Sequence, residues 1–224
     1  MRATSCACSG SAWRSCPRAL IAATNRWLRT ARVNRIVHVD NWLFSTNLHG
    51  DWRGEALADI RAHLVAHYPD HIVGIRSVDE WSCPGLLQAA RDDGWLLLPS
   101  RQIWVTDDVA AAFAGRKNIA NDRRALRRSG LRVEAPTLLD ADDAATIARL
   151  YGQLYLDKYS RLNPQLTPAY ISAAASSGAV QFHVARDAAG AIQAMAGVVV
   201  RGDLLTAPLV GYDTARPREE GLYR

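Results

Sequence analysis

Three apolar segments near the end of the sequence, separated by short turns, constrain the fold more than any other feature. AVQFHVAR (179–186), AIQAMAGVVV (191–200) and LLTAPLVGYD (204–213) are joined by DAAG (187–190) and RGD (201–203). Short connections rich in glycine and aspartate between segments of high strand propensity are typical of antiparallel hairpins. The sequence therefore predicts three consecutive antiparallel strands.

Two helices are predicted immediately before these strands. In residues 140–159, apolar residues recur at helical spacing, and the stripe ends at Lys158. A lysine at the end of such a stripe either extends to solvent or points into a cleft. Thr167 followed by Pro168 is typical of an N-cap with proline in the first helical position, and this second helix is expected to run to about Ser177. The stripe of the first helix comprises Ile147, Tyr151 and Leu154, with Leu150 and Tyr155 beside it.

Residues 35–107 alternate short apolar runs with helical patterns, which is typical of α/β proteins. Pro69 is expected to end the first of the two helices, and Pro99 to interrupt the last apolar run. The predicted elements are a strand at 36–40, a helix at 54–67, a strand at 71–77, a helix at 85–94 and one or two strands at 95–107.

The segment RKNIANDRRALRRSGLR (116–132) is predicted to be a helix with a continuous basic face, closed by Gly130. Such a face is compatible with simple solvation, with binding of a nucleic-acid backbone or with binding of the phosphates of a large cofactor. No aromatic residues of the kind used for base stacking are interleaved with the charges. One stripe consists of Arg116, Arg123 and Arg127, and its neighbour of Lys117, Arg124 and Arg128.

The first 34 residues are basic, since seven arginines precede the first acidic residue, Asp40. This composition fits either an organellar transit peptide or an ordinary basic helix near residues 15–30. No apolar run in the sequence reaches the roughly 18 to 20 residues of a membrane span, so no span is expected. A cytoplasmic location is expected, because a secretory signal is also lacking.

No metal site is expected from the cysteines and histidines. Cys6, Cys8 and Cys16 are one ligand short of a closed zinc site, and Cys83 stands alone. His63 and His67 lie four residues apart, but no accompanying glutamate completes an H-E-x-x-H arrangement.

The order of two helices, three strands and a turn before a further helix resembles the opening half of the GNAT acyltransferase fold. The stretches LYGQLYLDKYSRLNP (150–164) and LTAPLVGYDTARPREEGLYR (205–224), with the hairpin around DAAG, are similar to GNAT-superfamily N-acyltransferases of the FemAB-like branch. The resemblance implies a mixed α/β (α+β) sheet with flanking helices. It divides the chain into a basic N-terminal segment (1–34), a degenerate GNAT-like half (35–110) and the first part of an acyltransferase domain (111–224).

The resemblance also implies acetyl-CoA or another acyl-CoA as co-substrate, without a metal. In the family the helix after the central strand receives the pyrophosphate on its exposed N–H groups, at a motif [RQ]-x-x-G-x-[GA]. Arg218 and Gly221 match its first four positions, whereas Tyr223 stands where the family has a small residue. The implied cofactor-binding residues are Arg216, Arg218, Gly221 and Leu222.

For the amine acceptor, a small molecule or peptide, the resemblance points to Lys158, Tyr159 and Asn163. Tyr212 and Asp213, at the end of the last strand, are the nearest candidates for substrate contact or proton relay, although an aspartate there also caps turns. Segment 204–213 contains no glutamate, the base that many family members use. The catalytic residues are therefore unassigned.

Three alternatives remain open at this point. Fem-type relatives take the acyl group from aminoacyl-tRNA, which the basic face at 116–132 would suit. A non-catalytic protein of the same fold, or a nucleic-acid-binding module, would also fit. The resemblance further implies that the rest of the domain lies beyond Arg224, so the chain is expected to be an incomplete fragment with little activity by itself.

Overall fold

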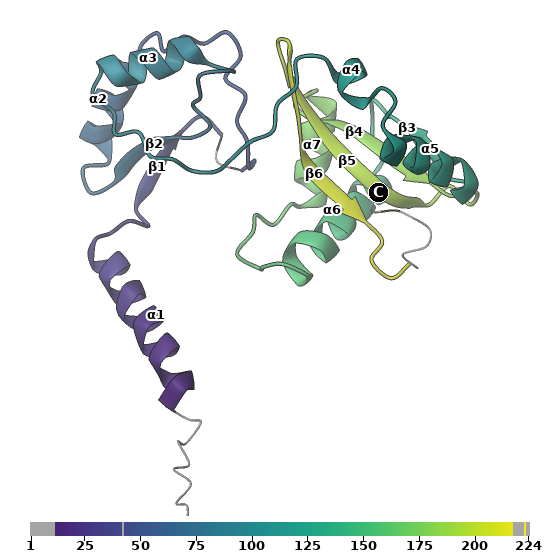
Figure 1. Cartoon of the computed structure of the whole chain (residues 1–224), viewed down its shortest axis with the longest axis horizontal. Helices are drawn as coiled ribbons and strands as arrows, with labels where there is room; N and C mark the ends of the chain where they lie inside the picture. Colours follow the sequence, from purple (N-terminus) through teal and green to yellow (C-terminus); the bar gives the residue numbers. More distant parts are fainter. Residues whose placement is uncertain (1–11, 42, 217–221, 223–224) are drawn as a thin grey trace, which may run out of the picture. The chain divides into compact units, whose positions relative to one another are not determined.

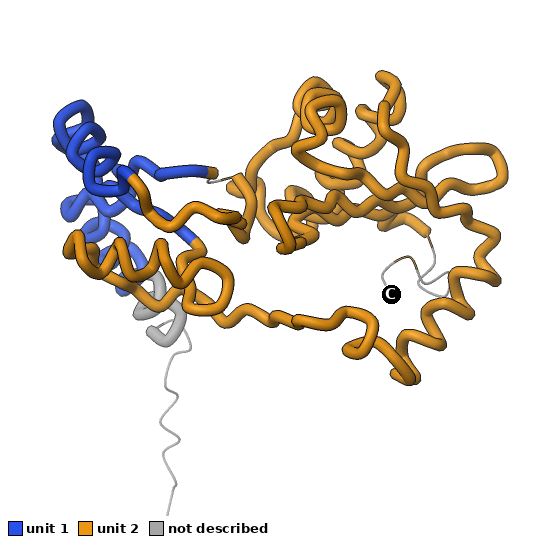
Figure 2. The backbone as a smooth tube through the Cα atoms, turned by 90° about the horizontal axis from the view of Figure 1, so that it is seen from above, with its two compact units in different colours: residues 1–40, 56–76 blue, residues 41–55, 77–224 orange. Residues whose placement is uncertain are grey.

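A computed structural model describes residues 12–41, 43–216 and 222, and its helices and strands are labelled in Figure 1. The chain forms two compact units, which Figure 2 shows in different colours. Unit 1 comprises residues 1–40 and 56–76, and unit 2 comprises residues 41–55 and 77–224. The two units are described separately below.

Unit 1 contains a long helix followed by a parallel strand-helix-strand motif. Strands β1 (Ile36–Val39) and β2 (Ile72–Ile75) pair in parallel, and helix α2 (Leu57–His67) lies between them in the sequence. The long helix α1 spans Ala12–Thr30. The strands and the helix predicted in this region are confirmed. Helix α2 ends at His67, and its C-cap Tyr68 is not helical, because proline at position 69 disfavours helical geometry in the residue before it.

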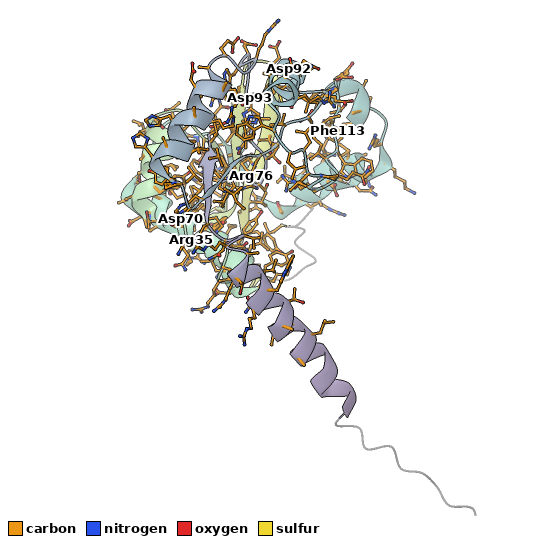
Figure 3. The ribbon with its side chains drawn as sticks, turned by 90° about the vertical axis from the view of Figure 1, so that its left-hand side faces the viewer. Arg35, Asp70, Arg76, Asp92, Asp93 and Phe113 are labelled. Atoms are coloured by element: carbon orange, nitrogen blue, oxygen red, sulfur yellow. The ribbon has the colours of Figure 1, made fainter. Side chains whose placement is uncertain are left out.

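An exposed ion pair joins the end of α1 to the start of β2. The Arg32 guanidinium lies 3.0 Å from the Asp70 carboxylate, and Arg35 lies 3.7 Å from it (Figure 3). Such exposed pairs add little to the free energy of unfolding. They connect the two segments locally without forming a core.

Unit 2 begins with helix α3 (Pro84–Asp92), which buries Leu86, Leu87 and Ala90. The strands predicted at 95–107 are wrong: these residues form no regular secondary structure and pair with no strand in the described part of the chain. A strand needs a neighbour to receive its backbone hydrogen bonds, and Pro99 also removes one donor. A short helix, α4 (Val109–Phe113), follows and was not predicted.

The predicted basic helix is confirmed as α5 (Lys117–Ser129), which Gly130 ends in the left-handed conformation with φ 71°. All six basic side chains of its two stripes are exposed. Strand β3 (Arg132–Glu134) follows and was not predicted.

Helix α6 (Ala141–Gly152) begins at Asp140, whose Oδ1 accepts a hydrogen bond of 2.7 Å from the Asp143 N–H. The helix predicted to run on to Tyr159 instead changes at Gln153 into the π-helical turn η1 (Gln153–Asp157). Helix α7 (Pro168–Ser176) starts as predicted, with Thr167 Oγ1 accepting from the Tyr170 N–H at 3.2 Å.

The three predicted strands are confirmed as β4 (Gln181–Arg186), β5 (Ile192–Arg201) and β6 (Leu204–Tyr212). With β3 they form an antiparallel sheet in the order β3-β4-β5-β6. Helices α6 and α7 pack on one face and enclose the core of unit 2, whose apolar burial supplies most of the driving force for folding. The core comprises Ala144, Ile147, Leu150, Tyr151, Ile171, Ala174, Val180, Phe182, Val184, Ile192, Met195 and Leu209.

Strand β6 carries a bulge in its middle. Gly197 pairs with Leu209 and Val199 with Thr206, so two residues of β6, Ala207 and Pro208, lie opposite the single residue between them on β5. Proline is accommodated there because a bulge leaves ladder positions unpaired. Bulges are over-represented next to active sites, which directs attention to this strand.

Candidate active site

The end of β6 lies directly against the backbone of α6. A Cβ atom added to Gly211 would lie 2.9 Å from the Leu150 carbonyl carbon and from the Tyr151 nitrogen. Only glycine permits this approach, since any larger residue would force strand and helix apart. The contact fixes the last residues of β6 beside the junction of α6 with its π-helical turn.

Side chains alternate between the two faces of a strand. Because Gly211 faces α6, the neighbouring Tyr212 lies on the opposite face of the sheet. The sheet therefore separates the Tyr212 side chain from the residues of α6.

Asp213 ends β6 and organises the turn after it. Its N–H donates to the Gln193 carbonyl at 2.9 Å, and its Oδ1 accepts from the Ala215 N–H at 3.0 Å. Asp213 therefore caps the turn, which is one of the two roles that the sequence left open for it; the other is substrate binding. The Oδ1 atom of Asp213 thus has a local structural partner, and the substrate-binding role of Asp213 stays a prediction.

The π-helical turn has its own hydrogen-bond arrangement. The Tyr155 carbonyl accepts from the Ser160 N–H at 3.0 Å and from Asn163 Nδ2 at 2.8 Å. A π-helix pairs residues five apart, and such turns occur frequently at functional sites. Asn163, a predicted acceptor-binding residue, thus holds the chain that leaves this turn.

Three tyrosines form a row along α6 and η1. The rings of Tyr151 and Tyr155 stack with centroids 4.6 Å apart, and the ring of Tyr159 lies 6.3 Å beyond Tyr155. Burial raises the pKa of the Tyr151 hydroxyl, and the neighbouring Tyr155 and Tyr170 raise it further. The row thus begins in the core and ends at the exposed Tyr159.

Lys158 and Tyr159, both predicted to contact the acceptor, lie together at the open end of this row. Lys158 Nζ is 5.5 Å from the centroid of the Tyr159 ring, within the range of a cation–π interaction. Both side chains are exposed, so Lys158 reaches solvent at the end of its stripe.

Gln153, the first residue of the π-helical turn, has a buried side-chain oxygen, Oε1, without a hydrogen-bond partner among the described residues. A buried acceptor left unpaired costs free energy and calls for an explanation such as a role in function. This residue was not predicted from the sequence, and neither was the tyrosine row, although the spacing 151, 155 and 159 could have indicated the row.

A polar recess of about 350 Å³ lies where the start of α6, the β4–β5 turn and the end of β6 meet; its lining includes Asp143, Arg149, Arg186, Gln193 and Asp213. The Arg186 side chain has a structural role. It pairs with both carboxylate oxygens of Asp143 and with Glu134, and it donates to the Gly190 carbonyl at 3.0 Å. The hydrogen bonds that it donates, chiefly those to Asp143, raise the pKa of its guanidinium.

The predicted cofactor-binding residues follow β6. Arg216 lies 3.9 Å from the Asp187 carboxylate of the β4–β5 turn, and Leu222 is a half-buried turn residue. Arg218 and Gly221 lie outside the described residues. Of the predicted cofactor-binding residues, Arg216 thus lies beside the β4–β5 turn, and the cofactor role of all four stays a prediction.

The described residues show two further general properties. They contain no cluster of histidine, cysteine, aspartate or glutamate suited to hold a metal ion. None of their helices combines the length and apolar character that crossing a bilayer requires.

Comparison with known proteins gives one match. Residues 114–220, from just before α5 to the turn after β6, match a family model described as an acetyltransferase (GNAT) domain. No curated protein and no solved structure gives a significant match. The mixed α/β architecture agrees with a GNAT-like fold, and the match supports a general acyltransferase function for this part of the chain.

Proposed function

We propose that the chain is an N-acyltransferase that moves an acyl group from acetyl-CoA or another acyl-CoA to the amine of a small molecule or peptide in the cytoplasm. The observation that carries the proposal is the GNAT-domain match over residues 114–220. The order of α6, α7 and the three antiparallel strands within that segment is consistent with it.

In this reaction the amine nitrogen attacks the thioester carbonyl carbon, a carbon–nitrogen bond forms and the carbon–sulfur bond breaks. The amine loses a proton and the departing thiolate gains one. Catalysis depends on holding the two reactants together and on donors aimed at the carbonyl oxygen. Strand β6 suits this role, because it is the last strand of the described sheet and its bulge interrupts regular pairing.

We assign the acceptor side to Lys158, Tyr159, Asn163, Tyr212 and Asp213, and the cofactor side to Arg216, Arg218, Gly221 and Leu222. Lys158 and Tyr159 lie at the open end of the tyrosine row, and Arg216, in the turn after β6, lies 3.9 Å from the Asp187 carboxylate of the β4–β5 turn. No catalytic base or acid is assigned. Strand β6 contains neither glutamate nor histidine that could take the proton.

A second candidate, a FemAB-like transferase that uses aminoacyl-tRNA, is favoured by one observation. The six basic side chains of α5 and its N-cap residue, Arg116, are all exposed within the matched segment. If tRNA were the donor, its affinity would fall steeply with salt, because binding releases counterions from the phosphates.

Calorimetric titration of the full chain with acetyl-CoA tests the first proposal. We expect binding in the micromolar to millimolar range typical of enzyme substrates. Exchange of Arg216 and Arg218 for alanine should weaken it, whereas Arg132→Ala, an exposed arginine on β3, should leave it unchanged.

The titration separates the candidates. Binding with thiol release in the presence of amines supports the N-acyltransferase. Binding without turnover for any amine supports a non-catalytic protein of the same fold. An absence of acetyl-CoA binding together with salt-sensitive tRNA binding would favour the second candidate.

A further inference from the structure

Helix α1 presents large apolar side chains to solvent on one face. Leu20, Ile21 and Trp27 are 68%, 67% and 67% exposed, and Leu28 lies beside them on the helix. At 100° per residue, these four side chains project within one arc of the helix. Unlike the apolar stripes of α2 and α6, this one buries against nothing in the described chain.

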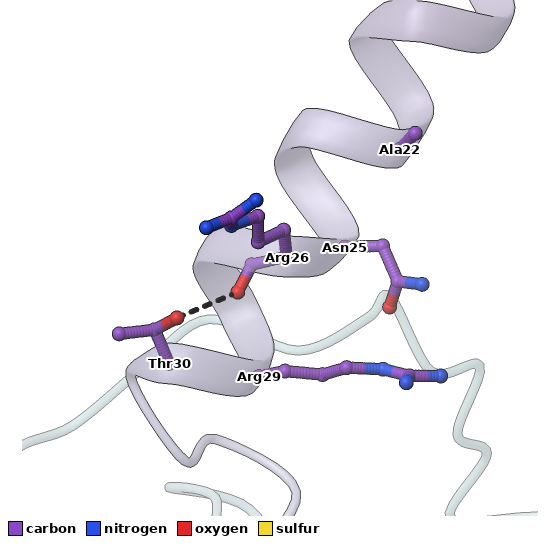
Figure 4. A pocket seen from close by; sticks show the side chains of 5 residues that line it. All are labelled: Ala22, Asn25, Arg26, Arg29 and Thr30. Atoms are coloured by element: carbon purple, nitrogen blue, oxygen red, sulfur yellow. Dashed lines mark hydrogen bonds between the residues drawn. The ribbon is translucent and has the colours of Figure 1, made fainter.

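The opposite face of α1 is polar and basic. Ala22, Asn25, Arg26, Arg29 and Thr30 line a shallow hollow along the helix (Figure 4), and Thr30 Oγ1 donates to the Arg26 carbonyl at 3.0 Å. The sequence of α1 contains no aspartate or glutamate. Positive charge on this face is therefore not compensated within the helix.

We propose that α1 lies in the surface of an anionic phospholipid membrane. A helix with arginine on one face and tryptophan and leucine on the other is suited to the boundary between headgroups and acyl chains. Tryptophan favours this boundary in particular. The arginines would attract anionic headgroups, while the apolar face would bury into the acyl region.

The two faces together favour a membrane over other partners. A nucleic acid would engage only the arginines and leave Leu20 and Trp27 in water, and an apolar groove of a protein would make no use of the arginines. An anionic membrane surface uses both faces at once. The helix lies along the surface and does not cross the bilayer, since it is not apolar enough to span.

Flotation of the full chain with lipid vesicles tests this proposal. One set of vesicles contains phosphatidylcholine alone, and the other contains phosphatidylcholine with phosphatidylglycerol. We expect binding to the anionic vesicles only. The double exchange Arg26→Gln and Arg29→Gln should weaken it about tenfold or more, at roughly 1 kcal/mol for each arginine near the surface. Leu20→Ser with Trp27→Ser should abolish it.

A matched control removes the same charge elsewhere. Arg123→Gln with Arg127→Gln takes two exposed arginines from α5 and should leave vesicle binding within about twofold of the unchanged chain, since α5 carries no comparable apolar face. Circular dichroism should show that all variants stay folded, because every substituted side chain is exposed.

The proposal fails if the chain does not float with anionic vesicles, if neutral vesicles bind it equally well, or if the α5 control weakens binding as much as the α1 variant. If the α1 arginines are instead needed for binding a short RNA and not for vesicles, the helix recognises nucleic acid. The test does not depend on the transferase proposal, because it measures neither acyl-CoA nor turnover.

Discussion

At the scale of single residues, Gly211 shows most clearly how the sequence determines the site. In the sequence Gly211 is one residue of a predicted strand, yet its missing side chain sets the distance between β6 and α6. Strand propensity and periodicity do not reveal such a contact, because it depends on which element packs opposite. The sequence predicted the strand but not its closest neighbour.

Gly211→Ala should lower the free energy of unfolding by about 1–3 kcal/mol. The new methyl group would meet backbone atoms of α6, which cannot move aside as a side chain can by changing its rotamer. Gly152→Ala is the matched control, because its Cβ would lie 3.9 Å from Leu156 Cδ1, an ordinary contact, and alanine favours helix. Urea denaturation should show a loss for the first and none for the second. Equal losses would mean that the close approach does not control stability.

The buried tyrosines predict a loss of stability at alkaline pH. The folded pKa values of Tyr151 and Tyr170 are raised above 10.0 by burial. The contribution of these tyrosines to the free energy of unfolding is therefore fully present below about pH 10. It is lost as the pH rises towards their pKa values in the folded state, because the unfolded chain releases these protons first. Tyr151→Phe and Tyr170→Phe should each reduce the drop in urea midpoint between neutral and strongly alkaline pH. Tyr159→Phe, at an exposed position, should leave the drop unchanged.

At the scale of elements, the sequence predicted those whose signals are local. Caps at Thr167 and Gly130 and the hairpin turns identify α7, α5 and the β4–β5–β6 strands from neighbouring residues alone. It missed β3 and the π-helical turn η1. A three-residue strand depends on its partner β4, and the change from α to π geometry depends on packing that helical periodicity does not encode.

Arg186 connects several of these elements, since its partners lie on β3, on α6 and in the β4–β5 turn. Arg186→Met should cost about 3 kcal/mol or more, because it leaves the Asp143 carboxylate, with only 16% of its side chain exposed, without its partner. Arg161→Met, which breaks an exposed pair with Asp157, should change stability by less than about 1 kcal/mol. Thermal or urea unfolding measures both, and comparable costs would contradict the structural role of Arg186.

At the scale of the whole molecule, the exposed apolar surface of residues 95–105 stands out. Leu96, Leu98 and Trp104 are 82%, 75% and 89% exposed in a segment without regular secondary structure or a strand partner. Soluble monomers rarely expose so many large apolar side chains together. Strands were predicted here because the segment is rich in apolar residues. Whether another strand lies beside the segment cannot be inferred from that composition.

Leu98→Ser with Trp104→Ser should reduce binding of a hydrophobic dye to the native chain without lowering the urea midpoint, because these side chains contribute no core contacts. Leu162→Ser is the control, since that leucine is 96% exposed but lies outside the segment. Dye fluorescence should fall strongly for the double variant and little for the control. A drop in the urea midpoint of the double variant would show that the segment is packed.

The π-helical turn has a consequence for how this protein can change over generations. A π-turn differs from an α-helix by one additional residue, so loss of a single codon within 153–157 would restore a regular helix without breaking the reading frame. Because the π-turn fits its extra residue into one wider turn, residues after the deletion would keep nearly their present direction relative to α6. One small genetic event could therefore remove the wide turn while the exposed end of the tyrosine row and the core of unit 2 stay in place.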